Sequence, residues 1–409
     1  MLHPYSERLL DISRIMTITA IVVVPFSTAL TSIAVAIAAL AWLCSGQALQ
    51  TLQCSLRHPV GKMLVIFFVV LLLGCLYGDA SWQERISTLG SWRKFFYPLI
   101  FLGLFTSHIW QRRFLKSFLT VMCIALPLTF LAWFEIIPSR PGRLDGILAN
   151  NHTTQSLAFI AAIICCIFFI REAAPRMKVI LGFLILLFAI DVLFVSTSRS
   201  GYLALMVGTG FAGLLVFGRK RIPLILALLL LAAGAAIFGS KALQSQVQRG
   251  FHEIVNYQHN AQFTPMGARV VFWENTLQLI REKPVFGYGT GSFEREYSRH
   301  IEGKYSDWRT TPTADPHNQY LFILVENGVF GLLVFLAFII VTIRQGMLIQ
   351  PYGVIAASVL AAWTATSLFN SHFKTFPEGH MLCLFLGVLL ARDLDRSTPL
   401  WKAYLNPFS

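Results

Sequence analysis

The sequence has little charge and few acidic residues for its length. Only 13% of the 409 residues are charged and 56% are hydrophobic, whereas about 25% of the residues of a soluble globular protein are charged. Lysine and arginine number 33 against 20 aspartates and glutamates, which gives a formal net charge of +13. Such a composition excludes an ordinary soluble domain and predicts an integral membrane protein.

Three kinds of ligand site are missing as well. None of the seven cysteines falls in the long polar segment at residues 240–318, and no Cys/His spacing resembles a zinc site. The run Gly287–Gly291 lacks both the glycine spacing and the preceding strand of a dinucleotide site, so we interpret it as a flexible turn. There is no Walker motif and no carboxylate cluster that could hold a divalent metal. We therefore expect neither a cofactor nor a metal.

Apolar stretches make up most of the chain. A spanning helix needs about 17–25 apolar residues, fewer when it is short or tilted, and the stretches predict an all-α polytopic membrane protein with about 12 transmembrane helices. We place the spans at residues 12–27, 29–45, 62–77, 94–108, 115–137, 153–170, 179–197, 201–217, 222–239, 319–343, 353–369 and 379–391. Pro25 favours a tight hairpin of the first two, and no small-x-small cleavage site follows the first, so we expect it to be retained.

The positive charges sort by side, which argues for a membrane orientation and not for nucleic-acid binding. With both termini taken as cytoplasmic, the inside segments hold 17 Lys and Arg and the short outside loops hold 7. Short loops determine orientation, so the segment at 240–318 is predicted to face outward, into a periplasm. The expected organisation is spans 1–9 in residues 1–239, a periplasmic loop in 240–318, and spans 10–12 with a cytoplasmic C-terminus in 319–409.

The outward loop has the pattern of surface helices. Residues 241 to about 262 are polar with apolar residues at helical spacing, which favours an amphipathic helix on the membrane. A break is expected at Thr264–Gly267, followed by a second amphipathic helix from Ala268 to Glu282 that ends at Lys283-Pro284.

Cations recur in the segments predicted to face outward. Arg199 lies among serines and threonines at the junction of two predicted spans, and Arg269 lies in the second loop helix with Trp273 one turn on. Arg143 and Asn151 flank the start of the sixth predicted span. The plain alternatives are that Arg199 reaches lipid phosphate, that Arg269 is a solvated charge, and that Asn150 or Asn151 simply caps the next helix.

Arg93 and Lys94 precede the fourth predicted span, where interfacial anchoring is the alternative to substrate binding. Several cations on one outward face are economically explained by binding of a lipid phosphate or pyrophosphate, to which arginine gives bidentate contacts. Side-chain cations would then replace a metal ion.

His317 is the best candidate for proton transfer. It lies in Asp315-Pro316-His317-Asn318, where the polar loop meets the apolar stretch that begins near Gln319. An imidazole suits a general base near neutral pH, and Asn318 could cap the next helix or contact a ligand. The alternative is a structural histidine.

These residues carry a resemblance to O-antigen ligases. His317-Asn318, nine residues, and then Gly328-Val-Phe-Gly331 resemble the His-Asn/Ser/Gln … Gly-x-x-Gly signature of that family. Arg199-Ser-Gly-Tyr-Leu203 is similar to its Arg-x-x-x-Leu motif. The likeness covers residues 195–345, and the rest of the chain agrees in topology only.

The resemblance implies a metal-independent, GT-C-like glycosyltransferase of the bacterial inner membrane with its site facing the periplasm. Its donor would be a polysaccharide linked to undecaprenyl pyrophosphate and its acceptor a sugar of lipid A–core. His317 would be the general base of an inverting displacement, and Arg199 and Arg269 would stabilise the leaving pyrophosphate. Arg143, Lys94, Arg93, Asn318 and Asn151 would assist substrate binding. The alternatives are an O-antigen polymerase, a protein O-oligosaccharyltransferase, or a polysaccharide-lipid transporter with cations at mid-membrane.

Overall fold

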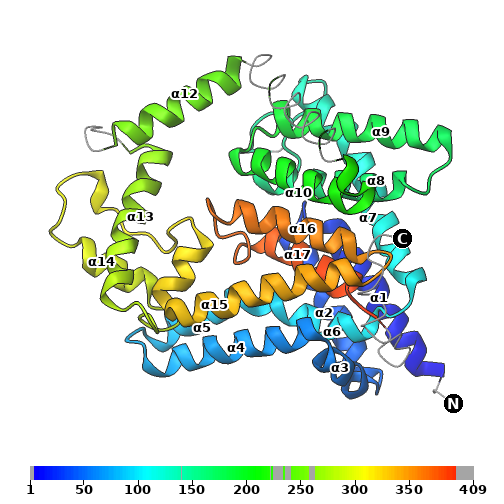
Figure 1. Ribbon diagram of the computed structural model, residues 1–409, viewed down its shortest axis with the longest axis horizontal. Helices are drawn as coiled ribbons and strands as arrows, with labels where there is room; N and C mark the ends of the chain where they lie inside the picture. Colours follow the sequence, from blue (N-terminus) through cyan, green and yellow to red (C-terminus); the bar gives the residue numbers. More distant parts are fainter. Residues whose placement is uncertain are drawn as a thin grey trace.

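The computed structural model describes residues 4–139, 141–221, 241–257 and 263–392, together with residues 223 and 234. Within these ranges every regular element is a helix and there is no strand. The protein is a bundle of long apolar helices with a smaller helical layer at one end (Figure 1). The predicted all-α fold is therefore confirmed, and the apolar helices identify a multi-pass membrane protein.

The helices follow one another in this order: α1 Pro4–Val23, α2 Thr28–Cys44, α3 Ala48–Arg57, α4 Pro59–Tyr77, α5 Trp82–Trp92, α6 Phe96–Leu104, α7 His108–Trp133, α8 His152–Ile170, α9 Pro175–Ile190, α10 Arg199–Phe217, α12 Lys241–Val255, α13 Pro265–Glu282, α14 Phe293–Ile301, α15 Gln319–Leu348, α16 Gly353–Thr366 and α17 Phe376–Leu389. The described residues also include four short helical turns, at Arg93–Phe95, Asp191–Val195, Arg219–Arg221 and Trp308–Thr310.

Fewer helices have the length and hydropathy of a span than the sequence predicted. Six described helices do so on their own, or seven if α2 and α3, bent by 107° at their break, count as one. The prediction of twelve is not reached because several apolar stretches form short helices. The predicted span 94–108 is the nine-residue α6, and α16 and α17 have 14 residues each, about 21 Å at 1.5 Å per residue. The predicted span 222–239 lies outside the described residues, apart from 223 and 234.

The short apolar helices form the centre of the bundle. From Pro377 to Leu389 every residue of α17 is buried, and α16 and α8 are buried along most of their length. Helix α16 packs against α10 and α15, while α15 also packs against α4. A helix that is apolar all round is stable only where neighbours cover it. The predicted hairpin of α1 and α2 is confirmed, because the two helices pack side by side around the turn at Pro25.

One end of the bundle gathers the connections that the sequence predicts to face outward. We call it the loop end; it comprises residues 78–95, 134–139, 141–151, 196–200, 263–318 and 367–375. Hydrogen bonds join Asn150 to Pro25, Thr153 to Ser198, and Lys94 to the backbone at Lys374. The loop end therefore contains residues that are far apart in the sequence.

The polar loop forms three helices, α12, α13 and α14, and the last two belong to the loop end. Helix α12 covers much of the first predicted amphipathic helix, whose last residues, 258–262, are not described. Helix α13 begins earlier than predicted, because Thr264 caps its N-terminus and Pro265 occupies the first turn, where the missing N–H of proline costs nothing. Its predicted end before Lys283 is confirmed.

Helix α15 is broken near its start, and the run Gly287–Gly291 fits into the break. Gly328 has φ +63° and ψ −167° within the helix. The N–H groups of Tyr288 and Gly289 donate to the carbonyls of Val325 and Glu326, at 2.8 Å each, and the N–H of Thr290 donates to Gly74 of α4. The interpretation of this run as a flexible turn needs correction, because both neighbouring helices hold its backbone.

Candidate active site at the loop end

His317 lies in a strained backbone conformation just before α15. Its φ is +54°, a left-handed value that only a few per cent of non-glycine residues adopt, asparagine, aspartate and histidine most often. The N–H of His317 donates to Asp315 Oδ1 at 2.7 Å, and Ser371 Oγ donates to the same oxygen at 2.8 Å. The carboxylate of Asp315 thus fastens the His317 turn to the segment between α16 and α17. Strain that several contacts hold in place is common at functional sites.

Two contacts orient the imidazole of His317. It stacks on Phe272 of α13, with ring centroids 6.1 Å apart and an interplanar angle of 26°. Its Nδ1 lies 3.4 Å from Asn370 Oδ1. In the tautomer that carries its proton on Nδ1, the Nδ1–H donates a hydrogen bond to the amide oxygen of Asn370, and Nε2 keeps a lone pair for a substrate. His317 is half-buried, so it is accessible from solvent.

Helix α13 brings Arg269 to the His317 turn. Arg269, Phe272 and Trp273 lie at helical spacing that places them on one face. The indole N–H of Trp273 donates to the carbonyl of Pro316 at 2.9 Å, which docks this face against the His317 turn. Burial and the nearby Arg199 guanidinium both lower the pKa of Arg269. The two arginines are therefore close enough to repel each other, an arrangement that an anion between them would stabilise.

Arg199 is the first residue of α10, and its surroundings fix its position. Ser198 caps the helix by accepting the N–H of Gly201 and lies 3.1 Å from Thr153 Oγ1. The preceding turn is held by the buried Asp191, whose carboxylate accepts hydrogen bonds from Ser196, Thr129 and Gln155.

Helix α12 closes over the Arg199 side chain. A Cβ atom added at Gly250 would lie 3.4 Å from Nη1 of Arg199. Helix α12 thus lies in van der Waals range of the guanidinium. The two arginines belong to α10 and α13, and α12 adds a neighbour to Arg199.

The other predicted substrate-binding residues lie at the loop end with different surroundings. Lys94 is 2% exposed, and its ammonium donates to the carbonyls of Lys374 and Thr375 at 2.5 and 2.9 Å. Arg93 donates to the carbonyl of Gly90 at 3.2 Å, and its guanidinium lies 5.9 Å from the ring centre of Phe376. Arg143 is exposed in the turn before α8. Their substrate roles stay predictions.

The two asparagines serve as helix caps. Asn151 Oδ1 accepts the N–H of Thr154 at 2.8 Å at the start of α8. Asn318 Oδ1 accepts the N–H groups of Tyr320 and Leu321 at the start of α15, at 3.0 and 3.1 Å. Both asparagines therefore act as helix caps, which is the alternative that the sequence left open. A ligand contact through their remaining polar atoms stays a prediction.

Sequence reasoning missed the segment 367–375 between α16 and α17. It supplies Asn370 and Ser371 to the His317 turn, and it contains His372, which is 1% exposed. Neither ring nitrogen of His372 has a hydrogen-bond partner among the described residues. Burial lowers the pKa of His372, opposed by the carboxylates of Glu378 and Asp315 and reinforced by Arg269. The signal in the sequence was the polar run Asn370-Ser-His-Phe-Lys374 between two short apolar stretches.

The side chains that could contact a substrate at this site are two arginines and a histidine, while the carboxylate of Asp315 holds the His317 turn. Within the described ranges, no group of three or more His, Cys, Asp or Glu side chains is placed to hold a metal ion. Together the residues could bind an anion between two guanidinium groups and accept a proton at the imidazole of His317.

Comparison with known proteins agrees with the resemblance in the sequence. Residues 183–336 match the family model described as O-Antigen ligase. This range contains Arg199, Arg269, His317 and the Gly328–Gly331 motif, and it largely coincides with the segment that carried the resemblance. The predicted similarity to O-antigen ligases is therefore confirmed for this part of the chain.

Two curated relatives are similar over longer stretches. An uncharacterized protein of Haemophilus influenzae is 28% identical over 233 residues, which are 56% of this chain and 57% of the relative. A protein of Rickettsia conorii, named "Putative polysaccharide ligase", is 25% identical over 292 residues, which are 69% of this chain and 66% of that protein. The chain thus spans less than two thirds of the length of either relative.

Proposed function

We propose that this protein is an O-antigen ligase, a membrane glycosyltransferase that moves a polysaccharide from undecaprenyl pyrophosphate to a sugar hydroxyl of lipid A–core. The observation that supports this most directly is the meeting of Arg199, Arg269 and His317 at one end of the bundle. All three lie within the segment that matches the O-antigen ligase family. The name of the Rickettsia relative is consistent with the same chemistry.

The arginine pair is suited to a pyrophosphate. Two close guanidinium groups repel each other, and burial of Arg269 strengthens the interaction of each with an anion. Negative charge grows on the pyrophosphate as its bond to the sugar breaks, so the pair stabilises the transition state more than the ground state. Side-chain cations then do what a divalent metal does elsewhere, and the reaction is expected to be metal-independent.

His317 is the general base of this proposal. Its Nε2 takes the proton of the acceptor hydroxyl while that oxygen forms a bond to the anomeric carbon. The bond between the anomeric carbon and the pyrophosphate oxygen breaks in the same displacement, and the electron pair leaves with undecaprenyl pyrophosphate. A single displacement inverts the configuration at the anomeric carbon. The energy comes from the pyrophosphate linkage, so no nucleotide is needed.

The proposed location is the inner membrane with the loop end in the periplasm. The count of 17 positive charges on one side against 7 in the short loops of the other supports this orientation. Lipid-linked polysaccharide and lipid A–core would both reach the loop end from the outer leaflet of that membrane.

The proposal is tested by transfer in liposomes with three purified components: the protein, an undecaprenyl-pyrophosphate-linked polysaccharide, and rough-type lipopolysaccharide that lacks surface polymer. We expect slower-migrating lipopolysaccharide on gels, with the same yield when EDTA is present. A requirement for added magnesium would contradict the cationic pyrophosphate site. Absence of transfer to lipopolysaccharide would contradict the ligase.

A strain that lacks the protein separates the ligase from its relatives. Loss of all polymer from lipopolysaccharide, with accumulation of lipid-linked polymer, is expected of a ligase. Retention of one repeat unit on the core would indicate a polymerase instead, and loss of glycan from protein would indicate an oligosaccharyltransferase.

A further inference from the structure

A polar cavity at the loop end is lined by residues other than those around the arginine pair. We call it the α5 pocket; its volume is about 500 Å³, within the range of about 300–1,000 Å³ for small-molecule sites. Its lining includes Ser87, Thr88 and Ser91 of α5, Phe293 and Glu294 of α14, and Glu326 and Lys374. None of its lining residues belongs to α10, α12 or α13, the helices that carry or adjoin Arg199 and Arg269.

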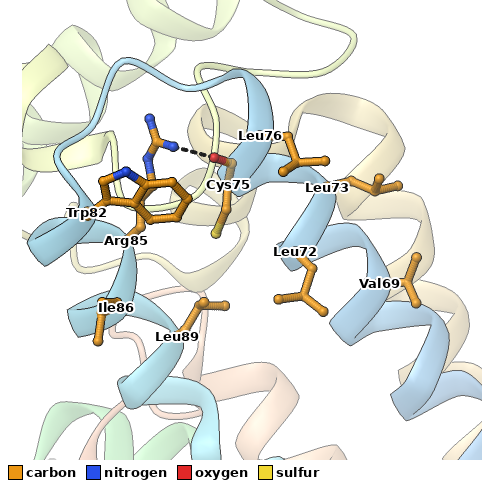
Figure 2. A pocket seen from close by; sticks show the side chains of 9 residues that line it. All are labelled: Val69, Leu72, Leu73, Cys75, Leu76, Trp82, Arg85, Ile86 and Leu89. Carbon is orange, nitrogen blue, oxygen red and sulfur yellow. Dashed lines mark hydrogen bonds between the residues drawn. The ribbon is translucent and has the colours of Figure 1, made fainter.

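Helix α5 presents a different chemistry on each side. In Figure 2, Trp82, Ile86 and Leu89 line an apolar pocket together with leucines of α4, and Arg85 donates a hydrogen bond to the carbonyl of Cys75. The opposite face, with Glu84, Ser87, Thr88 and Ser91 at helical spacing, lines the α5 pocket. The apolar face is suited to lipid, whereas the opposite face carries hydroxyl groups into the α5 pocket. The side-chain hydroxyls of Ser87 and Thr88 make no hydrogen bond to other described residues.

A buried carboxylate closes the inner wall of the α5 pocket. Glu326 is 1% exposed, and its Oε1 accepts the N–H of Gly291 at 3.0 Å. Its Oε2 has no hydrogen-bond partner among the described residues. A buried carboxyl oxygen without a hydrogen-bond partner is costly, so a ligand that forms a hydrogen bond with it would be stabilised there. The ammonium of Lys374 lies on the same wall, 3.5 Å from the ring centre of Phe322.

The balance of charge selects the class of ligand. Three acidic side chains, Glu84, Glu294 and Glu326, and one cation, Lys374, line the pocket, and Glu84 is already paired with Arg295 at 2.7 Å. The pocket thus lacks the cluster of cations that would hold a phosphate. These three carboxylates form no metal-binding group in the part of the chain that the structure describes. Hydroxyl, carboxylate and ammonium groups around one cavity are complementary to the alternating donors and acceptors of a neutral sugar ring.

The position of the pocket decides which sugar it would hold. Ala314 lines it and lies three residues before His317, and Lys374 lies four residues after Asn370, which contacts the imidazole. A single displacement needs the attacking hydroxyl opposite the leaving pyrophosphate. We propose that the α5 pocket binds the acceptor saccharide and directs its hydroxyl to His317, with the pyrophosphate on the α10–α13 side. This inference rests on the proposed glycosyl transfer and adds a site to it.

The test uses the full-length protein in liposomes with rough-type lipopolysaccharide as the acceptor probe. The double variant Ser87→Ala/Thr88→Val removes two hydroxyls with little change in volume. Loss of two neutral hydrogen bonds predicts a rise of about 5- to 100-fold in KM for the acceptor, with kcat and the KM for the donor unchanged. Glu326→Gln, which can still accept the N–H of Gly291, should raise the same KM.

Ile86→Ala is the matched control, because Ile86 lies on the apolar face of α5 and should leave all constants unchanged. A normal acceptor KM in the double variant and in Glu326→Gln would overturn the acceptor pocket while the ligase stands. If the wild-type protein transfers nothing, binding of the same lipopolysaccharide is measured directly. Binding that the double variant loses supports the pocket and counts against the ligase, and equal binding in both overturns the pocket.

Discussion

At the scale of single residues, one substitution of His317 distinguishes a general base from a structural histidine. His317→Gln keeps hydrogen-bonding atoms of similar reach but cannot accept the proton at neutral pH. If His317 is the base, turnover should fall by about 10²–10⁴-fold while the affinity for the lipid pyrophosphate donor is retained, because the arginines hold that group. The measurement is single-turnover transfer and donor binding on the purified variant. Turnover above about a tenth of wild type would remove His317 from the mechanism.

Arg199 and Arg269 are distinguished from simple lipid anchors by a change that keeps their charge. Arg199→Lys supplies a point charge in place of a planar fork that can form two hydrogen bonds. We expect transfer to fall at least about 10-fold in Arg199→Lys and further in Arg199→Ala, with Arg269→Ala similar or milder. Arg281→Ala serves as the control and should leave transfer unchanged, since Arg281 is exposed in the last turn of α13 and has no part in the proposed site. Full activity of Arg199→Ala would show that this residue is an anchor.

His372 predicts a dependence of stability on pH. Its pKa is lowered by burial, although Glu378 and Asp315 favour its charged form and Arg269 opposes it. The folded protein therefore holds His372 neutral, whereas the unfolded chain binds a proton below its ordinary pKa of 6.5. As pH falls below about 6.5, the free energy of unfolding should decrease by up to about 1.4 kcal/mol per pH unit from this group alone.

The check compares thermal unfolding midpoints of the wild type and His372→Gln in one detergent between pH 7.5 and pH 5. The comparison with the variant is needed because other buried histidines also make stability depend on pH. One of them is His58, whose pKa is lowered by burial to about 3. We expect the variant to lose less of its stability on acidification. A parallel decline of both proteins would show that His372 titrates alike in the folded and unfolded states.

At the scale of helices, the break in α15 depends on one glycine. A Cβ at Gly328 would lie 2.2 Å from the carbonyl oxygen of Val285, and its φ of +63° disfavours any side chain. Gly328→Ala should therefore destabilise the protein by more than the roughly 1–3 kcal/mol of backbone strain alone. A lower unfolding midpoint and weaker transfer are expected. Gly182→Ala in α9, where no atom lies within 4 Å of the added Cβ, should change neither.

The elements also show what sequence could and could not predict. Helical periodicity placed α13 within a few residues, and Lys283-Pro284 ended it where expected. Periodicity could not predict that Gly287–Gly291 would fill the break of α15, because that contact joins backbone atoms of three distant segments. Nor could it predict that Lys94 would be enclosed by the carbonyls of Lys374 and Thr375. Local pattern determines helices, whereas partners 280 residues away depend on packing.

At the scale of the whole molecule, the count of spans was the weakest prediction. Hydropathy finds apolar stretches, but α6, α16 and α17 are apolar because neighbouring helices cover them. Apolar residues serve a protein interior and a bilayer equally well, so composition alone cannot separate the two. The two short motifs were more informative, because His317 and Arg199 both lie at the loop end. The contact of His317 with Asn370 could not be predicted from them.

Orientation is a property of the whole molecule and is tested with fusions. A reporter active only in the periplasm, fused after Gly303 in an exposed turn, should be active. The same reporter fused after Arg221 should be silent, because the cluster Arg219–Arg221 belongs to the positively charged side. The reverse pattern would overturn the assignment of the loop end to the periplasm.

The hydrogen bonds of Lys94 also set an order of events during synthesis. Lys94 is synthesised early, and the chain must grow by 280 further residues before the carbonyl of Lys374 exists. His317 likewise emerges before Asn370 and Ser371, the residues that hold its turn. A chain that ends before Asn370 therefore lacks the carbonyl acceptors of Lys94 and the two side chains that hold the His317 turn. The His317 turn can reach its final geometry only when the segment 367–375 is in place.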